Sequence, residues 1–132
     1  MHGLHLTADL YGCRTDAALL VDARALSRLC RDAVAQVNLT VVDEKFFTFP
    51  YYDGHPGGVT GAVLLAESHL AIHTWPERDG ATLDVYVCNF TSDNTSKAEG
   101  VYRTLINALK PGDVLVERVQ RGRDLPLKKR VA

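Results

Sequence analysis

The sequence predicts an α+β fold, a two-layer α/β sandwich in which two helices cover one face of an antiparallel sheet, in the coarse order β-α-β-β-β-α-β. Several short segments alternate apolar and polar residues, as half-buried strands do. Short turns join neighbouring strands, and strands joined in this way pair antiparallel. Two longer segments have helical spacing. Two helices can cover only one face of the sheet, so the other face is solvated or buried against another chain.

The strands are expected where β-branched, aromatic or alternating apolar residues gather. In chain order these segments are residues 4–10, 39–49, 62–66, 69–75, 82–88 and 114–119. The residues between 49 and 58 form a loop by composition, rich in Gly, Pro and Tyr. Residues 121–132 are basic and lack periodicity, which predicts a solvated tail.

The two helices are expected at residues 22–37 and 96–109. In the first, Asp22 is a suitable N-cap and Cys30 falls on the apolar stripe, which favours a buried structural thiol. In the second, Ser96 and Glu99 have the spacing of a capping box, and Pro111 follows the last apolar position.

Length and composition narrow the function classes. The 132 residues predict one domain, 1–132, that buries a core without metal or disulfides. A net charge of −1 argues against nucleic acid or an anionic membrane as the main partner. No apolar run approaches the roughly 20 residues of a membrane span, and the N-terminus lacks a signal-peptide pattern. Cys13, Cys30 and Cys88 are too far apart for a disulfide framework or a structural zinc site, so we expect a cytoplasmic protein.

The segments 69–75 and 82–88 predict a two-faced hairpin. If its turn centres on Arg78 and Asp79, His73 lies opposite Asp84. One face, with Leu70 and Val85 on it, is then apolar and belongs under the helices. The other face gathers titratable and aromatic groups, which are costly to bury without a purpose. These groups are His69, His73, Trp75, Asp84, Tyr86 and Cys88.

Ordinary structural roles, a hydrolase triad and a zinc site are the interpretations open for these residues. Each histidine alone is most often a hydrogen-bonded strand residue, and Cys88 can be a small buried hydrophobe. A hydrolase triad of Ser68, His73 and Asp84 is possible on paper, but the serine lies in no GxSxG elbow. A zinc site of His69, His73 and Cys88 is disfavoured, because the two histidines are roughly 13 Å apart along a strand.

The runs AESHL at 66–70 and IHTWPE at 72–77, with residues 84–88, resemble the small prokaryotic S-adenosylmethionine decarboxylases. The match is dense from residue 58 to 88 and weaker but consistent elsewhere. The resemblance implies a pyruvoyl enzyme that makes its own cofactor and decarboxylates S-adenosylmethionine to the aminopropyl donor for spermidine. It also implies a homodimer of cleaved protomers that share their sites.

The resemblance implies self-cleavage between Glu67 and Ser68, which gives a β chain of residues 1–67 and an α chain of residues 68–132. The Ser68 hydroxyl attacks the preceding carbonyl, an ester forms, and elimination followed by hydrolysis leaves a pyruvoyl group at position 68. His73 matches the histidine that takes the α-proton. Thr60 stands where the family has a hydroxyl that assists processing.

The resemblance also assigns roles in turnover. The pyruvoyl group made from Ser68 would form a Schiff base with the substrate amine and act as an electron sink. Cys88 matches the proton donor to the decarboxylated carbon. Glu77 matches the carboxylate that binds the ribose hydroxyls.

An aromatic residue is expected to stack on the adenine, but the spacing departs from the family pattern. Phe49 lies eleven residues before Thr60, across a longer loop, so Phe49, Tyr51 and Tyr52 all qualify. Because this loop shapes the substrate site, the same machinery acting on arginine or ornithine is an alternative.

A third interpretation is a processing-dead homologue that serves as a binding or regulatory subunit. The retention of Ser68, His73 and Cys88 argues against it.

Overall fold

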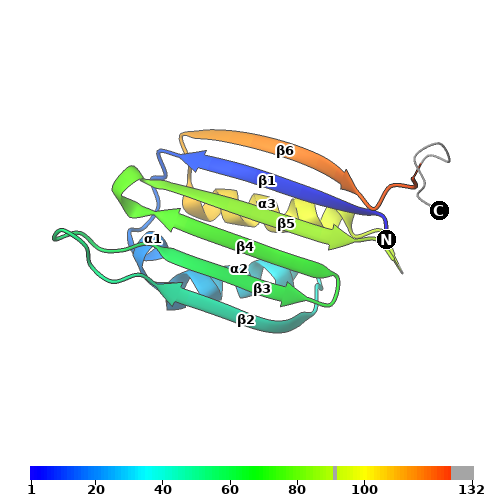
Figure 1. Ribbon diagram of the computed structural model, residues 1–132, viewed down its shortest axis with the longest axis horizontal. Helices are drawn as coiled ribbons and strands as arrows, with labels where there is room; N and C mark the ends of the chain where they lie inside the picture. Colours follow the sequence, from blue (N-terminus) through cyan, green and yellow to red (C-terminus); the bar gives the residue numbers. More distant parts are fainter. Residues whose placement is uncertain (91, 126–132) are drawn as a thin grey trace.

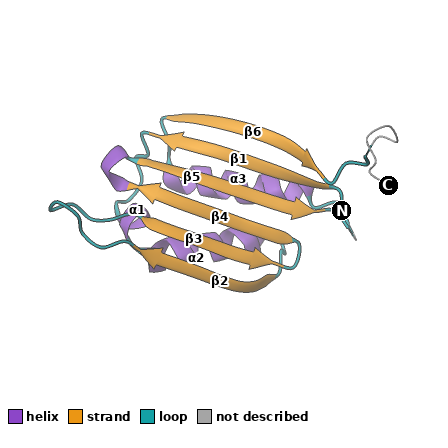
Figure 2. Cartoon of the chain, in the orientation of Figure 1, coloured by secondary structure: helices purple, strands orange, loops and turns teal. Residues whose placement is uncertain are grey.

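The computed structural model describes residues 1–90 and 92–125, so most of the expected basic tail lies outside the described residues. Its six-stranded antiparallel sheet has the order β2-β3-β4-β5-β1-β6. The strands are β1 (Gly3–Tyr11), β2 (Val41–Thr48), β3 (Val59–Leu65), β4 (Ser68–Trp75), β5 (Gly80–Cys88) and β6 (Asp113–Arg121). The helices are α1 (Ala18–Val21), α2 (Ala23–Gln36) and α3 (Thr95–Leu109), with a 3-10 turn η1 (Pro76–Arg78). The α-helices lie on one face of the sheet (Figures 1 and 2), which confirms the predicted α+β class.

The element order differs from the coarse prediction in two details. Four strands separate α2 from α3, as in the expected strand segments, whereas the coarse order β-α-β-β-β-α-β counts one strand too few. The four-residue helix α1, which was not expected, precedes α2. The N-cap prediction at Asp22 is confirmed, since its side chain accepts a hydrogen bond from the Arg24 N–H at 2.9 Å.

The predicted capping box at Ser96 is wrong. Helix α3 begins one residue earlier, at Thr95, whose N–H donates to the Asp93 carboxylate at 2.9 Å. This backbone hydrogen bond lowers the pKa of Asp93. Glu99 is instead engaged by Arg118 of β6 at 2.8 Å, so it does not cap the helix.

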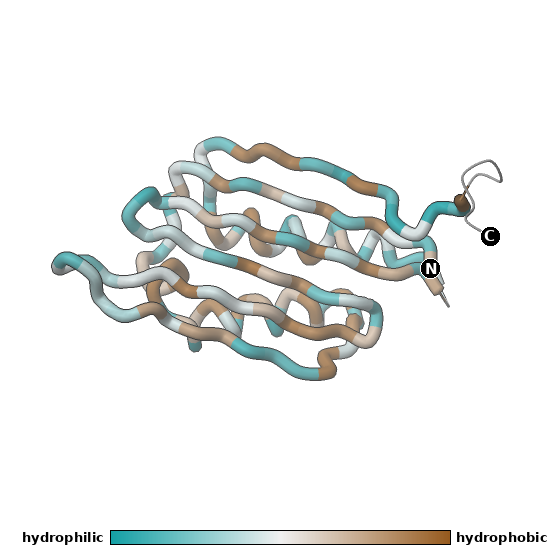
Figure 3. Tube along the Cα trace, viewed as in Figure 1, coloured by the Kyte–Doolittle hydropathy of each residue, from teal (hydrophilic) through white to brown (hydrophobic). Residues whose placement is uncertain are grey.

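The core lies between the sheet and the helices, where alternate strand residues point inward. Figure 3 shows apolar and polar residues alternating along the strands. Cys30 is fully buried among them, as predicted, and burial, followed by the nearby Glu44 charge, raises the pKa of its thiol to about 12. The largest fully buried side chains are Leu4, Leu6, Leu10, Leu26, Leu70, Ile72, Leu83, Leu105 and Leu109.

The β4–β5 hairpin has the predicted faces but not the predicted register. His73 lies opposite Thr82 rather than Asp84. Pro76 has no N–H to donate to the ladder, so it leaves the strand and starts η1. Asp79 then closes the connection with a positive φ of 47°. The resulting shift of two positions preserves which side chains share a face, because strand side chains alternate with a period of two.

Thr74 ties the middle of the sheet to α1 through a buried hydroxyl. The Val59 N–H donates to Thr74 Oγ1 at 2.8 Å, and Thr74 Oγ1 donates to the Leu20 carbonyl at 2.7 Å. Thr74 is only 5% exposed, so neither bond has water as an alternative partner at hand. The hydroxyl therefore fixes the start of β3 beside the end of β4.

Replacing Thr74 by valine tests this link, because valine keeps the shape and removes the hydroxyl. Two buried polar groups, the Val59 N–H and the Leu20 carbonyl, then lose their partner, and each such loss costs about 1–3 kcal/mol. We expect Thr74→Val to lower the free energy of unfolding by about 2 kcal/mol or more in urea denaturation. Thr74→Ser, which keeps the hydroxyl, should lose clearly less; equal losses would show that the hydrogen bonds contribute little.

Candidate active site

The predicted site residues fall into two groups at opposite ends of β4. Ser68 is the first residue of β4, and His73 lies two residues before its end and lines a cavity together with the 49–58 loop. Figure 1 shows that β4 starts beside the end of β5. The two residues are five positions apart, which is roughly 16 Å at the rise of a strand. A side chain does not span that distance, so the two groups do not form one site within a single chain.

The first group lies at the tight turn between β3 and β4. Leu65 pairs with Ser68, so only Ala66 and Glu67 connect the two strands. Ser68 has a positive φ of 149°, in a region that residues with a side chain rarely adopt. Such a conformation costs of order 1–3 kcal/mol and persists only where its surroundings hold it. The Glu67–Ser68 peptide is therefore a strained point of the backbone.

Cys88 lies against this turn from the end of β5. Its backbone N–H donates to the Glu67 carbonyl oxygen at 2.7 Å. Its thiol is free and partly exposed, whereas the thiols of Cys13 and Cys30 are buried. Burial raises the pKa of both buried thiols. Cys88 is thus the accessible thiol of the three, and it adjoins the strained peptide.

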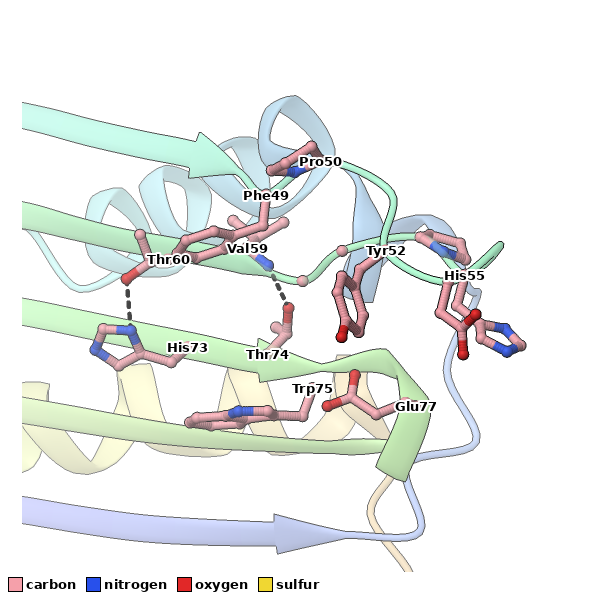
Figure 4. A pocket seen from close by; sticks show the side chains of 14 residues that line it. Phe49, Pro50, Tyr52, His55, Val59, Thr60, His73, Thr74, Trp75 and Glu77 are labelled. Carbon is pink, nitrogen blue, oxygen red and sulfur yellow. Dashed lines mark hydrogen bonds between the residues drawn. The ribbon is translucent and has the colours of Figure 1, made fainter.

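The second group begins with a hydrogen bond between neighbouring strands. Thr60 Oγ1 of β3 and His73 Nδ1 of β4 are 2.5 Å apart (Figure 4), in a directly opposed pair. For Nε2 of His73 to accept a proton, Nδ1 must carry the ring hydrogen and donate it to Thr60. The threonine therefore orients the ring and can select the tautomer with a basic Nε2.

A cavity of about 760 Å³ opens beside His73, within the size range of small-molecule sites. Phe49 and Tyr52 face it from the loop side, while Trp75 and Glu77 face it from the end of β4 (Figure 4). Tyr51, the third aromatic candidate, does not line it. The cavity thus combines aromatic surfaces, a histidine and a carboxylate.

Close backbone contacts fix the base of the loop. The Phe49 N–H donates to the Gly58 carbonyl at 2.9 Å. A Cβ on Gly58 would lie only 2.0 Å from the Thr74 carbonyl oxygen, so that position requires glycine. Asp53 and His55 from the loop also line the cavity. Neither was predicted as a site residue, although their polar character within an aromatic loop was a usable signal.

The open face of the sheet carries a further polar cluster at its centre. His5 Nε2 and Asp84 Oδ1 are 3.0 Å apart, and the Arg121 guanidinium lies 5.1 Å from the Tyr86 ring centre. Asp84 is thus engaged by His5, and the triad with Ser68 and His73 does not form. Large exposed apolar side chains surround the cluster; they include Phe47, Leu64, Trp75, Leu115 and Val119.

Within residues 1–90 and 92–125, no group of three or more His, Cys, Asp or Glu side chains is placed to hold a metal ion. Over the same residues, no helix has both the length and the apolar character needed to cross a bilayer.

Comparisons with known proteins identify the family. Residues 4–122 match the family model described as S-adenosylmethionine decarboxylase. An S-adenosylmethionine decarboxylase proenzyme of Picrophilus torridus is 38% identical over 120 residues, which cover 91% of this chain and 84% of that protein. An arginine decarboxylase proenzyme of Ignicoccus hospitalis is 35% identical, over 90% of this chain and 76% of the relative. The crystal structure of the adenosylmethionine decarboxylase from Aquifex aeolicus superposes with a TM-score of 0.80 at 38% identity, over 93% of this chain and 92% of that one. The chain therefore belongs to the S-adenosylmethionine decarboxylase family.

Proposed function

We propose that this protein is a pyruvoyl-dependent decarboxylase that cleaves itself between Glu67 and Ser68, and that it decarboxylates S-adenosylmethionine to the aminopropyl donor for spermidine synthesis. Cleavage gives a β chain of residues 1–67 and an α chain of residues 68–132. The observation that carries the proposal is the strained Ser68 at a tight turn, with the preceding carbonyl hydrogen-bonded to the Cys88 N–H. The three free thiols suit a cytoplasmic location.

The turn is suited to an acyl shift from nitrogen to oxygen. When the Ser68 hydroxyl attacks the Glu67 carbonyl carbon, negative charge develops on the carbonyl oxygen. The Cys88 N–H already donates to that oxygen at 2.7 Å, and such a donor binds more strongly as the charge grows. The strained φ of Ser68 raises the energy of the peptide relative to the ester. Both features favour the first step of cleavage.

In the second step, the elimination, Ser68 loses its α-proton to a base. The chain's own His73 is too far from Ser68 to be that base. We propose that His73 and Thr60 of a second copy serve Ser68, in a homodimer whose open sheet faces pack together. A two-fold axis that lies between the two packed faces, perpendicular to β4 and level with the midpoint between Ser68 and His73, lays each His73 end over the Ser68 end of the other copy. Such an isologous contact forms two identical composite sites.

The open face has the character of an interface. All three α-helices lie on the other side of the sheet (Figure 2), so nothing in the described chain covers this face. It exposes large apolar side chains, including Leu64 at 51% and Leu115 at 63%, around the polar cluster of His5 and Asp84. Burying such side chains against a second copy is favourable at roughly 25 cal/mol per Å² of apolar surface.

Turnover would use both groups of residues, the one around Ser68 and the one around His73. The pyruvoyl group made from Ser68 supplies an electron sink for loss of CO₂. The Cys88 thiol donates a proton to the decarboxylated carbon, and the Glu77 carboxylate accepts hydrogen bonds from the ribose hydroxyls. Phe49 and Tyr52, which line the cavity, are the better candidates for stacking on adenine than Tyr51. A purine nucleoside suits the volume and the aromatic lining.

Arginine or ornithine is the second candidate substrate. A relative at 35% identity is named an arginine decarboxylase proenzyme. The cavity also offers two carboxylates, Asp53 and Glu77, to a cationic side chain. A processing-dead binding subunit has less support, because Ser68, His73 and Cys88 are all present.

Self-cleavage is tested by removing its nucleophile. Ser68→Ala should leave one intact chain in mass spectrometry, whereas the wild-type protein should give two chains, the α chain blocked by a pyruvoyl group. Cys88→Ala is the matched control: it should still cleave, because the backbone N–H of residue 88 remains, and then lose most turnover. A Ser68→Ala chain that still splits after Glu67 would exclude this mechanism.

The shared site is tested by complementation between two inactive chains. Ser68→Ala and His73→Ala should each stay intact when produced alone. Co-expressed in equal amounts, they form mixed dimers in which one site combines Ser68 of one chain with His73 of the other. About half of the His73→Ala chains should then cleave, as random pairing into two-fold dimers requires, while the Ser68→Ala chains stay whole. No cleavage in the mixture would argue against composite sites.

Substrate identity is tested by CO₂ release from S-adenosylmethionine, arginine and ornithine. We expect release from S-adenosylmethionine. In that assay Glu77→Gln should raise KM about tenfold, because the hydrogen bonds from the ribose hydroxyls lose a charged acceptor. Release from arginine or ornithine alone would replace the lead candidate with the second.

A further inference from the structure

The Glu67 side chain makes a contact that the cleavage chemistry does not require. The backbone N–H of Thr40 donates to Glu67 Oε1 at 2.9 Å. In return, the Ala66 N–H donates to the Thr40 carbonyl at 2.9 Å. Thr40 lies immediately before β2, so this reciprocal pair ties the β3–β4 turn to the segment that follows α2.

Glu67 is thereby held from two sides. Its side chain is fixed by Thr40 near β2, and its main-chain oxygen is fixed by Cys88 at the end of β5. The strained Ser68 follows directly, itself paired with Leu65 and Val87. A residue keeps an unfavourable φ only when several contacts hold it in place, and these are the contacts available at this turn.

We infer that the Glu67 carboxylate is a positioning residue for self-cleavage, acting through its hydrogen bond to the Thr40 N–H. It holds the turn so that the Glu67 carbonyl stays on the Cys88 N–H and Ser68 stays strained. This inference rests on the proposed self-cleavage and adds a role for the side chain before the cleaved bond. Among the described residues Glu67 forms no ion pair, so what matters is an acceptor oxygen at this position rather than its charge.

The carboxylate itself takes no part in bond making. In the acyl shift, a bond forms between Ser68 Oγ and the Glu67 carbonyl carbon, the bond from that carbon to the Ser68 nitrogen breaks, and the hydroxyl proton passes to the nitrogen. An ester replaces a peptide, with no change in oxidation state. Strain in the starting peptide favours this step because it is released as the peptide bond breaks.

The test compares Glu67→Gln with Glu67→Ala in the full chain, and the rate of chain cleavage after cell-free synthesis is followed by intact mass. Glutamine keeps an acceptor for the Thr40 N–H and should cleave within about twofold of wild type. Alanine removes the acceptor and should cleave about tenfold more slowly, the effect of losing one hydrogen bond. Glu99→Ala is the matched control, since it removes a carboxylate paired with Arg118 in another part of the molecule, and it should cleave at the wild-type rate.

A second readout separates positioning from folding. Hydroxylamine cleaves an ester but not a peptide, so it measures the fraction of chain that has completed the acyl shift. In a His73→Ala background, which should stall after that shift, Glu67→Ala should lower the hydroxylamine-sensitive fraction and Glu67→Gln should not. In a Ser68→Ala background, which cannot cleave, both Glu67 variants should unfold within a few degrees of their parent.

The outcomes are distinct. Wild-type cleavage with equally fast cleavage of Glu67→Ala overturns the inference and leaves the proposed function intact. A Glu67→Gln chain as slow as Glu67→Ala also overturns it, because an acceptor would then not suffice. Slow cleavage of Glu67→Ala with an unchanged hydroxylamine-sensitive fraction, or with a chain that is unfolded at the assay temperature, overturns it as well. A wild-type chain that stays whole overturns the proposed function together with this inference.

Discussion

The fixed rise of a β-strand is the constraint on which the rest of this structure depends. Ser68 and His73 belong to one strand, so their separation of five positions is a separation of roughly 16 Å that no side-chain rotation removes. A strand also presents alternate residues to opposite faces, which commits one set to the core and leaves the other on the open face. The uncovered face and the divided site therefore have the same origin, and the proposed homodimer would account for both.

The two ends of β4 are held by different means, in line with the chemistry proposed for each. At the His73 end, side chains provide the order: Thr60 bonds the imidazole and the buried Thr74 hydroxyl joins β3 and β4 to α1. At the Ser68 end, backbone donors from Thr40 and Cys88 fix Glu67. A group that takes up a proton needs a fixed tautomer, which side chains can select. A peptide that rearranges needs a fixed main chain, which backbone hydrogen bonds supply.

Periodicity was sufficient to predict much of the fold. The alternation in 69–75 and 82–88 predicted the buried Leu70 and Val85, and the helical stripe predicted the buried Cys30. The predicted register of the hairpin was wrong, because the length of the turn depends on Pro76 leaving the ladder. The pairing of His5 with Asp84 could not be predicted either. The strands β1 and β5 are far apart in the sequence and become neighbours only through the strand order of the sheet. The local motif indicated Ser68, His73 and Cys88 as site residues. Their division between the two ends of β4 becomes clear only from the distance between positions along a strand.

The place of the proposed cleavage explains how a chain can be cut without losing its fold. A break after Glu67 opens a two-residue turn and leaves every strand whole. On one side of the break, Glu67 keeps its contacts with Thr40 and Cys88. On the other side, residue 68 begins β4, which stays paired along its length with β3 and β5. The strained φ exists only while the turn is closed, so cleavage removes an unfavourable conformation and spares the contacts that stabilise the sheet. Self-cleavage in the middle of a strand would be less favourable, because the relief of strain would be accompanied by the loss of ladder hydrogen bonds.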